Sequence, residues 1–500
     1  MSRTQRSAWS VANGLVFTLV SLSIGVVATP LLLSWLGSER FGTYRVLLDW
    51  LGYISLFEFG IGGALLARLA VAVGRNDVPA TRRLIASGLH VYFGVTLAMV
   101  ISGIAWVTFL PRLISTSTIS NTELRNAALI MLTLVLLTPL SVFRVLAEAR
   151  QRSYIINMAL TVQSVLITGL MLLTAWIGWR LIGQAFALVI VQVFTTLFLI
   201  WDGIRVYRGL RLEQSNRETV KDIWSLNWPT FILNLSGRTG LLTDNIIIGW
   251  VLGPAAVTGF FLTQRLATIA LNQMQYIGNA TWAGLVELHV QGESETFRTR
   301  LLELTKLVSG LSLCLLGPIA AYNFYFIERW VGALNYAGGA VSLIACINVW
   351  LWGIFSLWGW PVSGTGNVRR LAPYATAFTL VNVTISIVGA ILLGLIGPLL
   401  GTLVAFVTIN MWALPRVLNR LFGLSPWQLW RAALAPLVWG VPYVTLTYVV
   451  ARSHSLQGWF GLILEMMMAG MVGLALWWTF SLSGSDRAIW LARVRSALGR

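Results

Sequence analysis

The sequence predicts an all-α integral membrane protein of about 14 transmembrane helices, and three observations support this fold class. The 500 residues have a mean hydropathy of +0.77. Only 11% of them are charged, and continuous apolar runs recur along the chain. A span needs about 20 mostly apolar residues, and its backbone groups must be paired within the segment, as they are in a helix. A β-barrel is excluded because the runs do not alternate apolar with polar residues.

The predicted spans follow one another with short connections, which leaves no sizeable soluble domain on either side. The first apolar run follows Arg3 and Arg6 but is too long for the core of a signal peptide, so we expect a retained first helix. The spans cover roughly 13–35, 42–68, 86–110, 124–145, 154–176, 181–203, 225–250, 256–285, 302–325, 339–363, 371–395, 398–416, 433–451 and 459–482.

The net charge of +17 reflects topology and does not indicate nucleic-acid binding. If the N-terminus is cytoplasmic, 26 of the 35 Lys and Arg residues lie in the inside segments and their flanks, and three lie within spans. Only six lie in the outside loops: Arg40, Arg112, Arg125, Arg180, Arg329 and Arg452. This split follows the positive-inside rule and places both termini in the cytoplasm.

Neither a metal site nor a cofactor is expected. Cys314 and Cys346 fall within predicted spans, where buried thiols without a disulfide are expected. His90, His289 and His454 are far apart and have no second ligand at metal spacing. The phosphate-binding pattern G-x-x-x-x-G-K-[ST] is absent from the sequence, so energy would have to come from a gradient or from a partner.

Two pairs of stretches repeat in the same order. LLLSWLGSERFGTYRVLLDW (31–50) matches IIIGWVLGPAAVTGFFLTQRL (246–266) in having a Leu-Gly turn between two apolar runs. Downstream, residues 60–84 and 277–301 each end a span in a charged loop with a glycine followed by polar residues. Parallel repeats of this kind are typical of secondary transporters. We therefore expect six-helix lobes at 1–210 and 211–425, with two additional helices and a cytoplasmic tail at 426–500.

A polar stripe runs along the predicted seventh helix. Asn227, Asn234, Arg238 and Asn245 fall within about 40° of one another on a helix that advances about 100° per residue. A charge at bilayer depth costs at least about 2.5–3.5 kcal/mol, so such residues face the bundle interior or a wet cavity. We expect a solvated substrate cavity. The structural alternative is an interhelical hydrogen-bond seam or a buried pair of Arg238 with Asp244.

The predicted eighth helix repeats this pattern. Arg265, Asn272 and Asn279 are seven residues apart and share one face. On the second helix, Arg45 is a further candidate substrate residue, although it lies near the outer end. It could also pair with Asp49 four residues on, or extend its charge to the interface.

Three intramembrane carboxyl groups are candidates for ion coupling. They are Asp49, Glu58 in the stretch SLFEFGIGG, and Asp244 on the seventh helix. Each could exchange H⁺ or Na⁺, because an ionisable residue within a span is by default a functional candidate. For Glu58 a helix-packing hydrogen bond is the alternative.

The stretches LLLSWLGSERFGTYRVL and YISLFEFGIGGALLARLA resemble the polysaccharide-transporter flippases, the Wzx-type proteins of O-antigen, capsule and exopolysaccharide export. LTDNIIIGWVLGPAAVTGFF (242–261) resembles the seventh-to-eighth helix signature of that family. The resemblance implies a MATE-like, V-shaped pair of six-helix lobes plus two extra C-terminal helices, which alternates between inward- and outward-open states. Acidic residues of the family's seventh helix correspond to Asp244, and its cavity cations correspond loosely to Arg238 and Arg265.

The substrate that the resemblance implies is an undecaprenyl-pyrophosphate-linked oligosaccharide, moved from the cytoplasmic to the periplasmic leaflet of the bacterial inner membrane. A polysaccharide polymerase or export complex is an expected partner, and no catalytic residue is expected. The residue types agree with this substrate. Arg offers pyrophosphate a bidentate, permanently charged fork, and Asn offers sugar hydroxyls both donors and an acceptor. The arginine set of the related peptidoglycan-precursor flippases has no clear counterpart here, which disfavours that assignment.

Two other functions are weighed against this one. A multidrug cation antiporter of the same fold would be expected to line its cavity with acids and aromatics rather than with Arg. A membrane-embedded glycosyltransferase or polymerase would usually display catalytic carboxylates in a sizeable outer loop. The longest predicted outer loops, about 111–124 and 326–338, offer only Glu123 and Glu328.

Overall fold

The computed structural model describes residues 3–206, 220, 228–453, 458–482 and 487. Their regular structure is entirely helical, which confirms the predicted fold class. By length and composition, eleven of the described helical segments could cross a membrane, and two shorter apolar helices accompany them. One of the eleven, Val16–Glu58, covers most of the predicted span 13–35 and the first part of the predicted span 42–68, and the total of about 14 stays a prediction.

The chain divides into two compact units, Met1–Thr258 and Gly259–Arg500. The lobe boundary predicted at 210/211 lies outside the described residues. The seventh predicted span belongs to the first unit, together with α1.

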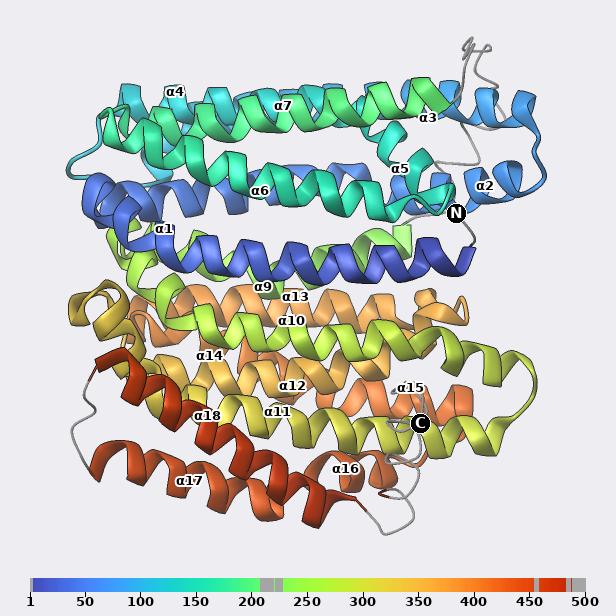
Figure 1. Ribbon diagram of the computed structural model, residues 1–500, viewed down its shortest axis with the longest axis vertical. Coiled ribbons are helices and arrows are strands. Elements are labelled where there is room, and N and C mark those ends of the chain that lie inside the picture. Colours follow the sequence, from blue (N-terminus) through green and yellow to red (C-terminus); the bar gives the residue numbers. More distant parts are fainter. Residues whose placement is uncertain (1–2, 207–219, 221–227, 454–457, 483–486, 488–500) are drawn as a thin grey trace. The chain divides into compact units, whose positions relative to one another are not determined.

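In the first unit, long helices pack side by side (Figure 1). Helix α1 lies along α6, α6 lies along α7, and the bent segment α4–η2–α5 packs against α3 and α7. The elements are α1 (Arg3–Ile54), η1 (Ser55–Glu58), α2 (Ile61–Gly74), α3 (Val78–Leu113), α4 (Asn121–Leu132), η2 (Thr133–Leu140), α5 (Ser141–Ala149), α6 (Ser153–Trp176), α7 (Arg180–Val206) and α9 (Trp228–Val251).

The predicted Leu-Gly turn divides α1 into two arms at Gly37, whose φ of 77° and ψ of 164° are not helical. Glycine permits this conformation because it has no Cβ. Two neighbours of the turn attach it to α4 and to the segment before it. The Glu39 carboxylate accepts hydrogen bonds from the backbone N–H groups of Ser117 and Thr118, and Arg40 forms a 3.0 Å ion pair with Glu123.

The second arm of α1 does not continue as the single span that the sequence predicts over 42–68. It gives way to the 3₁₀ turn η1, after which Phe59 (φ 50°) and Gly60 (φ 73°) are both left-handed. Helix α2 then begins at Ile61. Hydropathy missed this break because the apolar residues on either side keep the average high despite Glu58.

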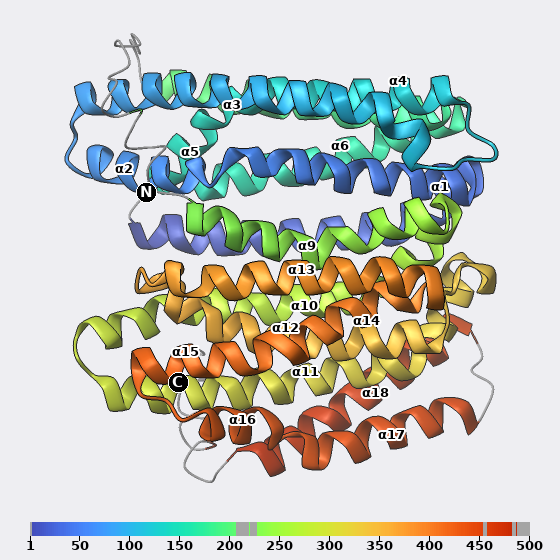
Figure 2. The same cartoon turned by 180° about the vertical axis from the view of Figure 1, so that it is seen from behind.

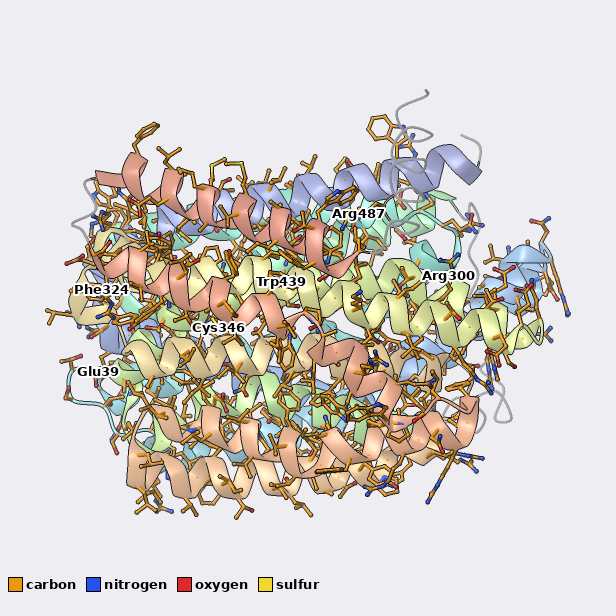
Figure 3. All side chains as sticks on the ribbon, turned by 90° about the horizontal axis from the view of Figure 1, so that it is seen from below. Glu39, Arg300, Phe324, Cys346, Trp439 and Arg487 are labelled. Carbon is orange, nitrogen blue, oxygen red and sulfur yellow. The ribbon has the colours of Figure 1, made fainter. Side chains whose placement is uncertain are left out.

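In the second unit, α11 packs against α12, α16, α17 and α18 (Figure 3, in which Arg300 and Phe324 lie toward opposite ends of α11). Cys314 and Cys346 are buried and free, as predicted. The elements are α10 (Pro254–Val290), α11 (Ser294–Val331), η3 (Ala333–Asn335), α12 (Gly339–Gly364), α13 (Val368–Leu393), α14 (Ile396–Ala405), η4 (Phe406–Asn410), α15 (Met411–Phe422), α16 (Pro426–Leu434), α17 (Leu437–Ser453), α18 (Gly458–Leu476) and η5 (Trp477–Ser481).

Candidate functional site

Helix α9 lies alongside α1 in both views of the ribbon (Figures 1 and 2). The two run antiparallel, because residue numbers fall along α9 as they rise along α1. Asp49 contacts Asn245, Tyr53 contacts Thr243, and Gly60 lies beside Asn234. The polar stripe predicted on the seventh helix therefore faces α1. Asn227, its first member, lies outside the described residues.

Asn245 is part of a helix–helix hydrogen bond. Its Nδ2 donates to Oδ2 of Asp49 at 2.7 Å, and the two side chains are only 9% and 6% exposed. For Asn245, the structure therefore shows the interhelical hydrogen bond that was the structural alternative to a substrate cavity. Arg45, half-buried one turn before Asp49, interacts electrostatically with that carboxylate.

Asp244 is buried next to this pair. It is 7% exposed, and within the described residues its Oδ1 has no hydrogen-bond partner. Asp244 interacts electrostatically with Asp49, and both carboxyl groups act on Tyr53, whose hydroxyl is hydrogen-bonded to Thr243. The site thus gathers two carboxyl groups, an amide oxygen and two hydroxyls in the apolar interior of the unit. Two carboxylates so placed repel one another strongly, and one added positive charge would offset that repulsion.

Arg238 is exposed and lies next to Gly52 of α1. A Cβ built on Gly52 would be 3.6 Å from Nη1 of Arg238. In the described part of the chain Arg238 forms no ion pair with Asp244, so the predicted alternative of a buried pair is not found there. Arg238 is ten residues, or about 15 Å, from the start of α9 and thirteen residues, or about 20 Å, from its end. Arg238 is therefore near the middle of α9, four residues before the short apolar segment Leu242–Val251.

Asn234, one turn nearer the start of α9, is also exposed. Its Nδ2 would be 3.8 Å from a Cβ built on Gly60, the second left-handed residue of the break. The glycine therefore leaves room for this amide beside the irregular backbone.

Glu58 is the last residue of η1 and does not join the other two carboxyl groups. Its Oε1 accepts a 2.6 Å hydrogen bond from the hydroxyl of Tyr92 on α3. The same oxygen would be 2.8 Å from a Cβ built on Gly62 in the first turn of α2. A carboxylate at this position is stabilised by the positive end of the α2 dipole. Glu58 is nine residues beyond Asp49, about 13 Å along the chain if helical.

Arg265 and Asn272 are both on α10, in the second unit. The Arg265 guanidinium carbon is 5.7 Å from the centroid of the Phe261 ring, and the side chain is half-buried. Asn272 is exposed, as a cavity residue would be. The side chain of Asn279 lies outside the described part of the structure.

An apolar cavity of about 310 Å³ lies among α11, α12 and α17. Cys346 and Trp350 are on its wall, and no charged side chain lines it. The Nε1 of Trp350 donates to Ser309 Oγ at 3.1 Å, so its polar group is satisfied within the helix packing. None of the predicted site residues lines this cavity.

Sequence reasoning missed Tyr53, Thr243 and Tyr92. Tyr53 carried a usable signal, because it is four residues beyond Asp49 and so shares its helical face. Tyr92 carried no such signal, because its partner Glu58 is 34 residues away in the chain.

Comparison with known proteins gives one family and one fold. The model of the family described as "Polysaccharide biosynthesis protein" matches residues 10–283. No curated protein sequence matches the chain.

The similar solved structures include a lipid II flippase MurJ in an inward closed conformation. It has a TM-score of 0.69 and 12% identity, over 93% of this chain and 98% of that one. An inward-facing multidrug resistance MATE transporter of the MOP superfamily has a TM-score of 0.60 and 17% identity, over 87% and 99%. A MOP superfamily transporter from Pyrococcus furiosus, described as having a binding pocket of reverse polarity, has a TM-score of 0.56 and 14% identity, over 89% and 96%. At these identities the likeness shows the fold alone.

Proposed function

We propose that this chain, which belongs to the polysaccharide biosynthesis protein family, is a flippase. Its proposed substrate is an undecaprenyl-pyrophosphate-linked oligosaccharide. It would move this substrate from the cytoplasmic to the periplasmic leaflet by alternating access. The observation that carries the proposal is the exposed guanidinium of Arg238 near the middle of α9, a helix that the sequence predicts as the seventh span. An exposed charge at bilayer depth is stable only in a water-filled cavity or against a charged ligand.

Pyrophosphate is the ligand group that best fits Arg238. Its oxygens accept the two parallel hydrogen bonds of a guanidinium fork, and the guanidinium stays charged at any physiological pH. Asn234 is exposed one turn away and can donate to and accept from a sugar hydroxyl. The polyprenyl tail can remain in lipid while only the head group enters the aqueous space.

Arg265, Asn272 and Arg45 complete the proposed substrate residues. The Arg265 guanidinium stacks over Phe261, and a guanidinium is a group that binds phosphate well. Asn245 would act by holding Asp49 in place, since its amide is used in that hydrogen bond.

The paired carboxyl groups Asp49 and Asp244 are the proposed coupling site, where one H⁺ or Na⁺ would bind between them. Buried acceptor oxygens support this role: within the described residues, Oδ1 of Asp244 and Oδ1 of Asn245 have no hydrogen-bond partner. Glu58 is a separate candidate, because it contacts Tyr92 rather than this pair.

The remaining parts of the proposal concern the cell. We place the protein in the bacterial inner membrane with both termini cytoplasmic, as a transporter without catalytic activity of its own. Lobes at 1–210 and 211–425 would alternate, and a polysaccharide polymerase or export complex would receive the product.

A multidrug cation antiporter is the second candidate, and the buried Asp49–Asp244 pair favours it. Acidic groups in an apolar interior suit exchange of one cation for another. Arg238 weighs against it, because a fixed, exposed cation repels a cationic substrate.

Export of the lipid-linked glycan by Arg238 variants tests the flippase. We expect Arg238→Ala to weaken substrate binding by about 1.5–3 kcal/mol, or roughly ten- to hundredfold, because a charge-assisted contact is lost. Arg238→Lys keeps the charge but not the fork, so it should lose less. Arg144→Ala is the control, because it removes an exposed arginine that is paired with Glu148 on the same helix.

Detergent melting temperature is measured on the same variants. Lost export at a normal melting temperature supports the binding role. A lowered melting temperature that Asp244→Asn restores would make Arg238 structural and would contradict the proposal.

A further inference from the structure

We infer that the first turns of α9 and the break between α1 and α2 form a sugar subsite. In this site the glycan extends from the phosphate at Arg238 toward the start of α9. The inference rests on the proposed function, and it adds a direction and two ring-binding positions that the phosphate contact does not supply.

The break itself indicates a wet surface. Irregular backbone at membrane depth is tolerated only where it is enclosed in protein or lines a water-filled cavity. The break begins about 25 Å along the helix from the Gly37 turn, which is within a hydrocarbon core of about 30 Å. None of Ser55–Glu58 is buried, and Phe59 and Gly60 are also partly exposed. Because these residues are only partly enclosed in protein, their irregular backbone favours a water-lined position.

Aromatic rings gather at the break. The ring centroids of Phe59 and Phe231 are 4.6 Å apart, and those of Phe231 and Trp228 are 5.4 Å apart. Phe57 continues the cluster at 6.0 Å from Phe59. Trp228 is 66% exposed, so much of its indole is available to a ligand.

The polar groups that a sugar needs are beside these rings. A pyranose packs its C–H face on an aromatic ring and offers hydroxyls at its edge, where an amide can donate and accept. Asn234 brings its amide next to Gly60, and the methyl group of Thr230 packs there as well. An apolar lipid tail would pack on the rings but would leave the amide without a partner. Rings and an amide side by side therefore indicate a carbohydrate.

The order of residues along α9 gives the direction. Arg238, Asn234, Phe231 and Trp228 follow one another at four, three and three residues, so each step is about one turn, or 5.4 Å. One sugar ring with its glycosidic bond has about the length of one turn. A diphosphate at Arg238 therefore places the first ring near Asn234 and the second near Phe231 and Trp228.

Aromatic residues also occur at membrane interfaces without binding any ligand. Binding to the purified full-length protein separates sugar binding from an interface role. Three probes are used: undecaprenyl diphosphate, the same lipid carrying one N-acetylglucosamine, and the same lipid carrying a disaccharide. We expect Trp228→Ala to weaken binding of the disaccharide probe by roughly tenfold and binding of undecaprenyl diphosphate by less than about twofold. Trp228→Phe keeps a ring and should recover most of the loss.

Trp250→Ala is the matched control, because Trp250 is an exposed indole (47%) at the other end of the same helix. We expect it to bind all three probes like the wild type. Equal losses for the three probes in Trp228→Ala would make the ring cluster structural, and no loss at all would make Trp228 an interface residue; either result overturns the subsite.

The wild-type protein distinguishes this inference from the proposed function. If it binds the three probes with equal affinity, the phosphate site stands and the sugar subsite is wrong. If it does not bind undecaprenyl diphosphate, the proposed function fails, and the subsite fails with it.

Discussion

Asp244 and Asp49 show how single residues in this chain combine structural and functional demands. Asp49 is held by Asn245 and interacts with Arg45, whereas Asp244 is buried and its Oδ1 lacks a hydrogen-bond partner among the described residues. An unsatisfied buried carboxyl oxygen costs free energy, and a structure retains it only where something else depends on it. A small bound cation would give this carboxyl oxygen a partner and would explain why it is retained.

Charge removal at the carboxyl groups tests ion coupling. In vesicles with imposed pH or Na⁺ gradients, we expect Asp244→Asn to reduce gradient-driven transport on the order of tenfold, because the bound cation loses a ligand charge. Asp49→Asn should act in the same direction. Glu58→Gln is measured alongside, since its amide oxygen can still accept from Tyr92. If Asp244→Asn and Glu58→Gln both keep wild-type rates and the same gradient dependence, neither residue is a coupling site.

The candidate residues were predictable only one at a time. Periodicity alone identifies Asn234, Arg238 and Asn245 as one face of a helix, and the structure shows that face turned toward α1. It could not separate their roles, because these depend on the register between α1 and α9. That register places Asn245 against Asp49 and leaves Arg238 opposite Gly52, where no side chain covers it.

Among the elements, the break between α1 and α2 is the feature that most departs from prediction. An apolar run with two glycines after Gly60 reads as a continuous span, and hydropathy does not detect a change of backbone conformation. The left-handed pair Phe59–Gly60 is stabilised by contacts distant in sequence, including Phe231 against Phe59 and Tyr92 against Glu58. Because these contacts join different helices, the local sequence could not predict the break.

Stability of glycine variants tests the break. We expect Gly60→Ala to lower the free energy of unfolding by about 1–2 kcal/mol, because a Cβ at φ 73° meets the following carbonyl oxygen. Gly63→Ala is the matched control three residues on, inside α2, where an added Cβ meets nothing within 4 Å. It should be neutral or stabilising by about 0.5–1 kcal/mol, as Ala in a helix usually is. Equal stability of the two variants in a detergent melt would show that the left-handed conformation at Gly60 is not required.

For the whole molecule, the fold class was the most predictable property. Chain-wide hydropathy and the absence of alternation were sufficient to predict an all-helical, multi-pass membrane protein, and the family followed from the resemblance of three short stretches. Finer divisions were not predictable, because α1 joins two spans through Gly37 while the α4–η2–α5 segment divides one span into three parts. In both places apolar composition is unchanged and only the backbone geometry differs.

Membrane topology is the last property that the sequence predicts for the whole molecule. The N-terminal end of α1, the α2–α3 turn and the end of α7 lie at one end of the first unit (Figure 1). Arg75, Arg82 and Arg83 are at that turn or just beyond it, and the positive-inside rule predicts that this end is cytoplasmic. Reporter fusions at residues 115, 215, 332 and 425 should therefore read outside, inside, outside and inside. Residue 215 lies outside the described residues. A periplasmic signal at 215 would give the first lobe an odd number of spans, and the two repeats could then not be parallel.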